Sequence, residues 1–391
     1  MGKNILLCVT GSIAAYKSVG IARRLIESGA SVNVVMTRAS ERFITPLTFE
    51  SVTGKKVFSD LFDEPLSHIS LPEDTDLLLI APATANIIGK YAAGIADDML
   101  TTILLAYDGP VLIAPAMNSK MYSNPIVKKN IKYLSGLGVK FIGPESGALA
   151  CGDKGVGRMS EPDDIVEAVI NELSVKDLKG RNIVVTAGPT IEPIDPVRFI
   201  SNRSSGKMGY EIARAASRRG ADVTLISGPS SLTPPAGVSF YKAGSATEMK
   251  DIVDKKFRSC NAVIMTAAVS DFTPSAASSS KIKKGELATL KLKQSPDILK
   301  ELGKKKGRRM LVGFAAESSK DIVSAKKKLK EKNLDMIVLN DITKKDAGFN
   351  VDTNIVTIID RNGNAADYPK MMKSEIADLI LNRMVELWET K

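Results

Sequence analysis

The chain has 391 residues, 44% of them hydrophobic, which is enough for two or three domains that each bury a core. Its cysteines, Cys8, Cys151 and Cys260, are too few and too irregularly spaced for a disulfide framework or a cysteine-rich metal site, and they favour a reducing, cytoplasmic location. No apolar run approaches the roughly 20 residues that span a bilayer, so neither a membrane protein nor a signal peptide is expected.

The net charge of +10 is concentrated in the second half. Residues 1–180 carry 18 Lys and Arg against 20 Asp and Glu, whereas residues 281–332 carry 17 against 6. Such a basic stretch suits nucleic acid, a polyphosphate ligand or a solvated helix face. Because aromatic residues are only 5% and no nucleic-acid-binding motif is present, a phosphate ligand with solvation is favoured over nucleic acid.

The first half alternates apolar runs with helical patterns. Runs rich in Val, Ile and Leu at 4–9, 32–36, 77–81 and 111–114 predict parallel strands buried on both faces, and helices are expected at 14–27, 126–137 and 163–173. We therefore expect an α/β domain over residues 1–175 with a flavodoxin-like, doubly wound parallel sheet. The polar stretch 174–180 is the expected linker.

Small and polar residues follow three of these strands. Gly11 and Ser12 come directly after the first strand and before a helix, where backbone amides face a bound anion. The segments 81–86 and 114–118 end two further strands, and strand ends of a doubly wound sheet form one crevice. These segments are expected to meet there, unless Pro and small residues merely terminate the strands.

His68 and Cys151 are the two candidates for proton chemistry. His68 is the only histidine and is expected on or beside a loop, where an imidazole with a pKa of about 6.5 can bind a carboxylate or exchange protons, although a lone histidine is more often structural. Cys151 lies in a loop with glycines and charges, so it is expected to donate a proton rather than to pack, as Cys8 does within its strand.

The second half, residues 181–391, repeats the alternation of strands and helices found in the first half. Segment 181–185 resembles 3–7, and each runs into Thr and Gly as in the first strand–helix turn of an open sheet. Strands are expected near 182–187, 221–226, 261–266, 310–315 and 334–339, with helices near 206–219, 245–257, 296–306 and 320–332. The prediction is a second Rossmann-like domain with a hairpin inserted at 282–292 beside the small-residue loop 275–280.

Two familiar nucleotide fingerprints are absent. Neither strand–helix turn extends to Gly-x-Gly-x-x-Gly, and residues 204–207 are no Walker A loop, because position 201 is Ser where Gly is required. Any nucleotide here is held in a less common way.

The first half resembles the phosphopantothenoylcysteine decarboxylase family of flavoproteins in segments 11–17, 68–71, 115–118 and 150–153. The second half resembles phosphopantothenate-cysteine ligase in segments 200–209, 267–271 and 281–284. In this order the matches are similar to the bifunctional coenzyme A biosynthesis proteins and cover essentially the whole chain.

The first resemblance implies a domain that binds FMN, with candidate flavin contacts at Gly11, Ser12, Thr37, Thr84 and Asn86. It also implies catalytic positions at His68, Asn118 and Cys151. In that family the flavin takes electrons from the substrate thiol and returns them after the carboxylate has left. Asn118 would then hold the carboxylate and Cys151 would supply the proton, while His68 would either position the carboxylate or transfer a proton.

The second resemblance implies that CTP activates 4'-phosphopantothenate as an acyl-cytidylate before the amine of L-cysteine attacks. Asn202 would steady that intermediate, and Lys281 would neutralise the charge that builds on the phosphate oxygens. The implied nucleotide contacts are Met265, Thr266, Ala267, Asp271, Pro296, Asp297, Ile298, Leu299, Phe314, Lys328 and Lys332. Lys328 and Lys332 are four residues apart and are expected on one helix face, whereas Lys326 and Lys327 are expected to be solvated.

Mg²⁺ is expected with the triphosphate, but its protein ligands are not identifiable. The resemblance implies trimers of flavin domains and dimers of ligase domains. Three alternatives stay open at this point: ATP in place of CTP, a flavin-binding regulatory or structural protein without turnover, and nucleic-acid binding through residues 281–332.

Overall fold

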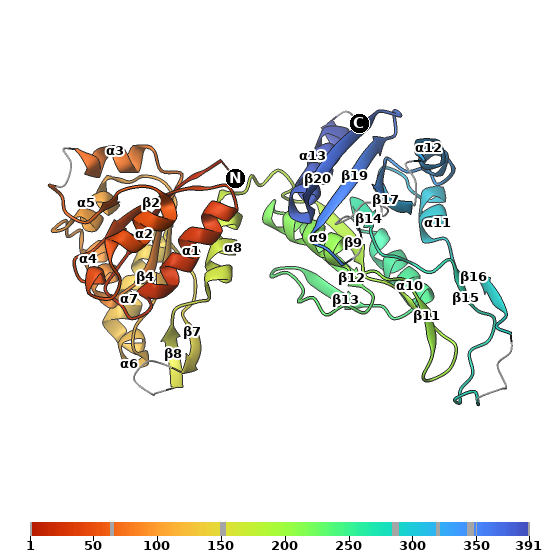
Figure 1. The fold of residues 1–391 in the computed structure, drawn as a ribbon, viewed down its shortest axis with the longest axis horizontal. Coiled ribbons are helices and arrows are strands. Elements are labelled where there is room, and N and C mark those ends of the chain that lie inside the picture. Colours follow the sequence, from red (N-terminus) through yellow and green to blue (C-terminus); the bar gives the residue numbers. More distant parts are fainter. Residues whose placement is uncertain are drawn as a thin grey trace. The chain divides into compact units, whose positions relative to one another are not determined.

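The computed structural model describes residues 2–62, 66–148, 154–283, 289–317, 321–341, 348 and 350–389. The chain divides into two compact units, Met1–Ser174 and Val175–Lys391. Figure 1 shows that each unit is built around its own sheet.

The first unit contains a six-stranded sheet of order β3-β2-β1-β4-β5-β6, and all neighbouring strands run parallel. Without the short edge strand β3 this is the flavodoxin-like order that the sequence predicted. All residues of β4 are buried, which explains its continuous apolar sequence. The strands are β1 Asn4–Val9, β2 Ser31–Met36, β3 Val57–Phe58, β4 Leu77–Ala83, β5 Val111–Pro115 and β6 Lys140–Phe141.

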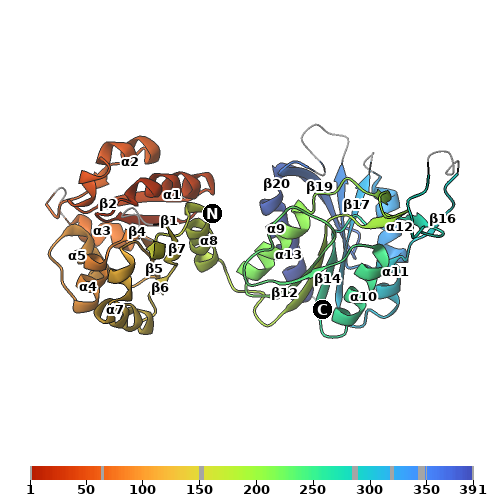
Figure 2. The same ribbon diagram turned by 90° about the horizontal axis from the view of Figure 1, so that it is seen from below.

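Helices cover both faces of this sheet (Figure 2). On one face lie α1 Ala15–Glu27, α2 Pro46–Thr53 and α8 Pro162–Leu173. On the other lie α4 Ala85–Ala93, α5 Met99–Ala106 and α7 Pro125–Gly136. The 3-10 helix η1 Ser40–Arg42 and the short helices α3 Ser67–Glu73 and α6 Ser119–Ser123 lie in connections. Between β6 and α8, the strands β7 Glu145–Ala148 and β8 Lys154–Arg158 pair antiparallel.

The second unit has an eight-stranded sheet of order β13-β12-β9-β14-β17-β18-β19-β20. From β13 to β18 the strands are parallel, and β19 and β20 add an antiparallel edge. The five predicted strands are present, whereas β13, β19 and β20 were not predicted. The strands are β9 Asn182–Ala187, β12 Asp222–Ser227, β13 Ser239–Lys242, β14 Ala262–Met265, β17 Met310–Glu317, β18 Met336–Asp341, β19 Thr353–Asp360 and β20 Ala365–Met372.

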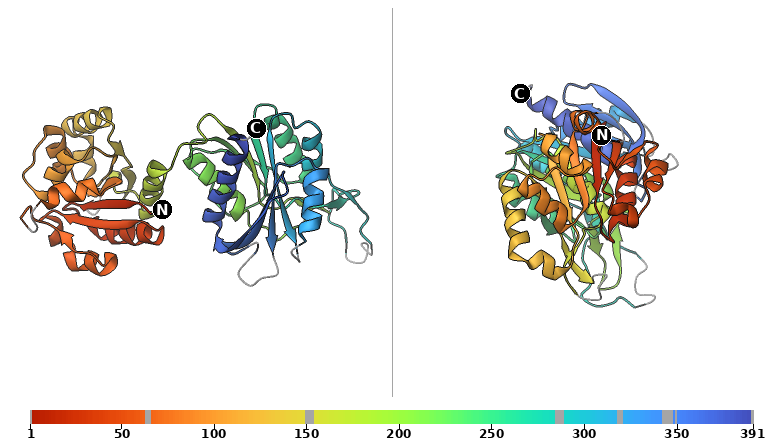
Figure 3. Two further views of the ribbon diagram at one scale, coloured as in Figure 1. Left: turned by 90° about the horizontal axis from the view of Figure 1, so that it is seen from above. Right: turned by 90° about the vertical axis from the view of Figure 1, so that its left-hand side faces the viewer.

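Helices cover both faces of the second sheet as well (Figure 3). Helices α9 Lys207–Arg218 and α13 Lys373–Glu389 pack on one face. Helices α10 Ala246–Phe257, α11 Ile298–Lys304 and α12 Ile322–Glu331 pack on the other. Among the helices of the described ranges, none is both long and apolar enough to cross a membrane.

Two sequence predictions need correction. The stretch 174–180 is not only a linker, because Leu178 is fully buried in the core of the second unit and Asp177 forms an ion pair with Arg219. The inserted hairpin also differs from the predicted one: β15 Phe272–Pro274 pairs with β16 Leu292–Gln294, so the paired strands enclose the small-residue loop instead of following it. Residues 284–288 lie outside the described residues.

Gly209 is required by the close packing of α9 on the sheet. A Cβ at this position would lie 2.4 Å from Thr266 Oγ1 and 2.6 Å from Ala187 Cβ. We predict that Gly209→Ala destabilises the second unit by about 1–3 kcal/mol, because inserted atoms displace a packed helix. Chemical denaturation followed by circular dichroism measures the change.

Gly136→Ala is the matched control, since a Cβ at this helical position in the first unit meets no atom within 4 Å. It should leave stability unchanged or raise it by up to about 1 kcal/mol. Equal effects of the two substitutions would contradict the packing argument.

Candidate active sites

The first candidate site lies at the carboxyl edge of the first sheet. Four neighbouring strands, β2, β1, β4 and β5, end there, and each is followed by residues that the sequence singled out. The structure therefore brings the following residues to one edge: Thr37 after β2, Gly11 and Ser12 after β1, Thr84 and Asn86 after β4, and Asn118 after β5.

The turn after β1 packs directly on the turn after β2. A Cβ on Gly11 would lie 2.6 Å from Ala39 Cβ and 3.1 Å from the Ala39 carbonyl oxygen, so only glycine fits. Ser12 Oγ accepts a hydrogen bond from Ala14 N–H at 3.3 Å, at the start of α1. Thr84 likewise caps α4, accepting from Ile87 N–H at 3.5 Å. Hydroxyl groups and helix starts thus converge at this edge, as anion binding requires.

Thr10 joins the two strands on either side of the switch point, between β1 and β4. Its side chain is buried, and Oγ1 donates to Pro82 O at 2.7 Å and accepts from Thr84 N–H at 3.2 Å. Sequence analysis did not select Thr10. In the sequence, Thr10 is marked only by its position between Val9 and Gly11. That position does not show that its hydroxyl bonds to residues more than 70 positions away.

Asn118 is held at the same edge by the β7–β8 hairpin. The Met117 N–H donates to Gly157 O at 3.0 Å, and a Cβ on Gly157 would lie 2.2 Å from Met117 O. Asn118 caps α6, and its Oδ1 accepts from Lys120 N–H at 2.8 Å. Cys151 belongs to the connection between β7 and β8 by sequence, but it lies outside the described residues.

His68 is the second residue of α3, in the first turn of the helix and not in its middle. Its ring is half-buried, and Nδ1 is buried without a hydrogen-bond partner among the described residues. A buried ring nitrogen in that state costs free energy unless a ligand or water satisfies it. This is the one observation in the structure that favours a ligand-binding role for His68 over a packing role.

The second candidate site is a cavity of about 760 Å³ at the carboxyl edge of the second sheet. Its volume falls in the range of small-molecule sites. Most of the predicted ligase residues line it: Asn202, Met265, Thr266, Ala267, Asp271, Pro296, Asp297, Ile298, Leu299, Phe314 and Lys332. Asn202 follows β11 Phe199–Ser201, Met265 ends β14, and Thr266, Ala267 and Asp271 come after it. Residues 296–299 lead from β16 into α11, Phe314 lies within β17, and Lys332 follows α12.

The wall of this cavity is fixed by hydrogen bonds between strand ends. Asn202 Nδ2 donates to Ala268 O at 3.0 Å, which orients the amide at the mouth of the cavity. Thr186, fully buried at the end of β9, accepts from Ala267 N–H at 3.2 Å through its hydroxyl and from the Thr266 hydroxyl through its carbonyl. The turn after β14 is thereby held beside β9.

Lys328 and Lys332 lie one helical turn apart at the end of α12, where the Lys332 N–H donates to Lys328 O at 3.0 Å. Helix α12 ends at Glu331, so Lys332 lies at its C-cap, and only Lys332 lines the cavity. Lys332 Nζ pairs with Asp297 Oδ2 at 2.9 Å, and Asp297 also caps α11. The ion pair joins two elements at the cavity wall.

Lys281 lies outside the cavity lining, and its side chain is exposed where the chain leads from β15 towards β16. Ile282, which follows Lys281, is held by two side chains of the second unit. Asp195 Oδ2 accepts a hydrogen bond from Ile282 N–H at 3.2 Å, and Arg198 donates one to Ile282 O at 2.9 Å. The Arg198 guanidinium holds the pKa of the Asp195 carboxyl well below its usual range. The base of the Lys281 segment is therefore anchored next to the ribbon of β10 Ile191–Pro193 and β11.

The loop that the sequence excluded as a Walker A motif, residues 204–207, belongs to the second site. Residues 204–209, part of the segment 200–209 that carries the ligase resemblance, line the cavity at the start of α9. Gly206 caps this helix with φ of 84°, a conformation that favours glycine. Within the described ranges, no three His, Cys, Asp or Glu residues form a group that could hold a metal ion.

Thr10→Val tests whether the first site depends on the bridge between β1 and β4. Valine keeps the shape but leaves Pro82 O and Thr84 N–H without their partner, so we expect a loss of about 1–3 kcal/mol in stability and weaker flavin binding. Denaturation and flavin titration measure the two effects. Thr10→Ser keeps the hydroxyl and should bind flavin nearly as the wild type does; equal losses in both variants would refute the role of the hydroxyl.

Each half of the chain matches a known family. Residues 1–174 match the Flavoprotein family, and residues 178–387 match the family described as DNA/pantothenate metabolism flavoprotein C-terminal domain.

Whole-length relatives carry both halves in the same order. The coenzyme A biosynthesis bifunctional protein CoaBC of Bacillus subtilis (strain 168) is 49% identical over 98% of this chain and 97% of its own length. The protein of the same name from Escherichia coli (strain K12) is 43% identical over 100% of this chain and 98% of its own. A crystal structure of the C-terminal domain of CoaBC shares 40% identity, covering 55% of this chain and all of that chain with a TM-score of 0.48. By the extent and identity of the whole-length matches, this chain belongs to the family of coenzyme A biosynthesis bifunctional proteins.

Proposed function

We propose that this protein catalyses two consecutive steps of coenzyme A biosynthesis. The second unit joins L-cysteine to 4'-phosphopantothenate at the expense of CTP, and the first unit converts the product to 4'-phosphopantetheine with FMN. The observation that carries the proposal is the cavity of the second unit, which gathers Asn202 and the ends of neighbouring strands into one space large enough for a nucleotide and a second substrate.

The ligase begins with a carboxylate, which is a poor electrophile. Its oxygen attacks the α-phosphorus of CTP, and pyrophosphate leaves with the electron pair of the broken P–O bond. The amine of cysteine then attacks the carbonyl carbon of the acyl-cytidylate, loses a proton and releases CMP. The cavity excludes water from the activated acyl group, which would otherwise be hydrolysed.

Asn202 is assigned to the acyl-cytidylate. Its amide is oriented by Ala268 O, so it presents a fixed dipole to the intermediate without reorganisation. Lys281 is assigned to the phosphate charge of the first step. The ribbon before and after Lys281 begins at Phe272 and ends at Gln294, and both of these residues line the cavity, which supports a contact of Lys281 with a bound nucleotide.

The residues of the first site fit a flavin nucleotide. The turn around Gly11 is packed too tightly for any side chain, and hydroxyl groups of Ser12, Thr37 and Thr84 lie at adjacent strand ends for a phosphate. When bound, the flavin supplies the oxidation and the return of electrons that allow the substrate carboxylate to leave.

Asn118, His68 and Cys151 are assigned to the substrate of the first unit. The contact of Asn118 Oδ1 with Lys120 N–H orients its amide nitrogen as a donor to the carboxylate. The unpartnered Nδ1 of His68 gives that ring a site for a ligand hydrogen bond, either to position the carboxylate or to move a proton. Cys151 is assigned as the proton donor on sequence resemblance alone.

The proposal includes Mg²⁺ with the triphosphate, assembly into homo-oligomers and a cytoplasmic location. A divalent cation is supported by the charge of the nucleotide, since triphosphates are bound in proteins with Mg²⁺. A flavin-binding protein without turnover is disfavoured because the chain keeps His68, Asn118 and Cys151 together with both halves of the family.

Product analysis tests the two steps. Purified protein should be yellow and should form 4'-phosphopantetheine from 4'-phosphopantothenate, cysteine and CTP, with release of pyrophosphate and carbon dioxide. Mass spectrometry with CTP and ATP supplied separately gives the nucleotide preference. A colourless preparation that FMN does not restore would contradict the decarboxylase assignment of the first unit, and failure with CTP would contradict the ligase assignment of the second unit.

Cys151→Ser separates electron transfer from the final protonation. Serine is a far weaker acid than a thiol, so an oxidised, decarboxylated product should accumulate while 4'-phosphopantetheine falls by about two orders of magnitude, as for loss of a general acid. Product mass distinguishes the two species. Unchanged formation of 4'-phosphopantetheine would remove Cys151 from the mechanism.

A further inference from the structure

A short stretch between β18 and β19 forms part of the nucleotide cavity. Gly348, Asn350, Val351 and Asp352, here called the clamped segment, precede β19, and Gly348 lines the cavity. Two lysines from the starts of two different helices bind this segment, and neither was selected from the sequence.

Lys207 is the first residue of α9. Its Nζ donates to Asn350 O at 3.0 Å and pairs with Asp352 Oδ1 at 2.6 Å. Lys207, which lies in the segment that is no Walker A loop, thus forms an ion pair with a residue 145 positions later in the chain.

Lys373 is the first residue of α13 and is only 4% exposed. Its Nζ donates to Gly348 O at 2.9 Å and to Val351 O at 2.5 Å, and its backbone N–H donates to Asp352 O at 2.9 Å. Together, the two lysines engage a side chain or carbonyl of every member of the clamped segment.

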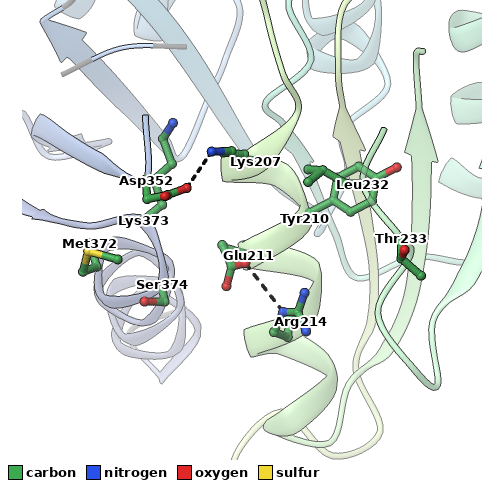
Figure 4. Close-up of a pocket in the computed structure, with 10 residues that line it drawn as sticks. All are labelled: Lys207, Tyr210, Glu211, Arg214, Leu232, Thr233, Asp352, Met372, Lys373 and Ser374. Atoms are coloured by element: carbon green, nitrogen blue, oxygen red, sulfur yellow. Dashed lines mark hydrogen bonds and ion pairs between the residues drawn. The ribbon is translucent and has the colours of Figure 1, made fainter. Parts of the chain in front are cut away.

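Both lysines face two cavities. They line the nucleotide cavity and also a neighbouring cavity of about 400 Å³, whose wall includes Glu211 and Arg214 (Figure 4). Figure 4 shows the ion pair between Lys207 and Asp352, with Lys373 beside it. The lysines and the clamped segment thus border both spaces, and a shift of either side chain would change the shape of the nucleotide cavity.

We propose that Lys207 and Lys373 are positioning residues of the ligase site, which hold the clamped segment where it forms one wall of the nucleotide cavity. The inference rests on the proposed CTP-dependent ligase. Neither lysine is required to touch a reacting atom.

The clamp depends on charged donors. A buried carbonyl that loses its partner carries a desolvation cost, and a hydrogen bond from an ammonium is stronger than one from a neutral amine. Removal of Lys373 would leave Gly348 O and Val351 O without this donor, so the wall would no longer be held in the geometry that binds the nucleotide.

The protonation of Lys373 gives the clamp a pH dependence. Burial, and then the neighbouring Lys207, lower the pKa of Lys373 to about 8, while Asp352 opposes the shift. The other charged groups around it are Glu211 and Arg214 of α9 across the smaller cavity and Glu375 of its own helix.

Stability and nucleotide affinity should therefore respond to pH in opposite directions. Above a pH of about 8 the folded chain releases this proton, while the unfolded chain keeps it up to the ordinary lysine pKa near 10.4, so the Lys373 contribution to stability rises with pH in that window. The clamp loses its charged donor over the same window. A merely structural lysine would not weaken nucleotide binding while stability rises.

The test uses the full-length, flavin-loaded protein and measures KM and kcat for CTP between pH 7 and 9.5. For Lys373→Met at pH 7, KM should rise about tenfold while kcat changes by less than about threefold, because binding rather than chemistry is affected. Wild-type KM should rise above pH 8, and the variant should lack that rise. Lys373→Arg should keep a low KM at pH 9.5, because arginine stays charged.

Two further variants distinguish loss of the clamp from general misfolding. Asp352→Asn changes a side chain that is 70% exposed and removes the ionic partner of Lys207, so it should fold and raise KM for CTP severalfold. Lys326→Met, on the exposed face of α12, is the matched control and should leave KM and the pH profile unchanged. Decarboxylation of supplied 4'-phosphopantothenoylcysteine should be normal in all variants.

Several outcomes would overturn the inference. It fails if folded Lys373→Met, or Asp352→Asn where Lys373→Met does not fold, binds CTP as the wild type does. It also fails if wild type and Lys373→Met share one pH profile. A wild type without CTP-dependent activity would instead overturn the proposed function, and the role of the lysines with it.

Discussion

Both candidate sites depend on a threonine at the end of the first strand of each sheet. Thr10 ties β1 to the turn after β4, and Thr186 ties β9 to the turn after β14. In each sheet these are the two strands between which the strand order reverses. Strand ends at that point leave backbone groups unpaired, and a buried threonine satisfies two of them or of their neighbours in each sheet. The Thr10 hydroxyl donates to Pro82 O and accepts from Thr84 N–H, whereas Thr186 accepts from Ala267 N–H with its hydroxyl and from the Thr266 hydroxyl with its carbonyl oxygen. The crevice between the two strands can then accept a ligand while the backbone groups that line it keep their hydrogen-bond partners.

The two units differ in the elements that are added at the carboxyl edge of their sheets. In the first, the β7–β8 hairpin packs against Met117 through Gly157, just after the end of β5. In the second, the sheet continues into antiparallel strands β19 and β20, and helix α13 starts directly after β20. That extension places Lys373 and Asp352 beside the start of α9. A duplicated plan is thus adapted to two chemistries by what is added at the carboxyl edge, as is general for α/β folds.

Predictions from the sequence succeeded where a local pattern has one physical meaning. The continuous apolar runs of β1, β4 and β9 could be interpreted only as buried strands or buried helix segments, and their length decided for strands. The predictions failed where an element forms through contacts with other segments and its own sequence carries no clear pattern. The strand β20 is largely exposed and is interrupted by Asp367, Pro369 and Lys370, so its pairing with β19 has no signature of its own.

The two sheets and most of the residues at the strand ends could be predicted from the sequence, because parallel strands carry their chemistry at one edge and their buried cores are visible in composition. Which polar groups meet could be seen only in the folded chain. The partners of Lys207, Lys373 and Thr10 come from segments remote in the chain or from backbone atoms, which every residue type possesses. The fold also separated Lys332, at the cavity, from Lys281, on an anchored ribbon, although both are lysines in one basic stretch. Composition records the number of charges, whereas packing sets the distance between them, and electrostatic energy depends on that distance.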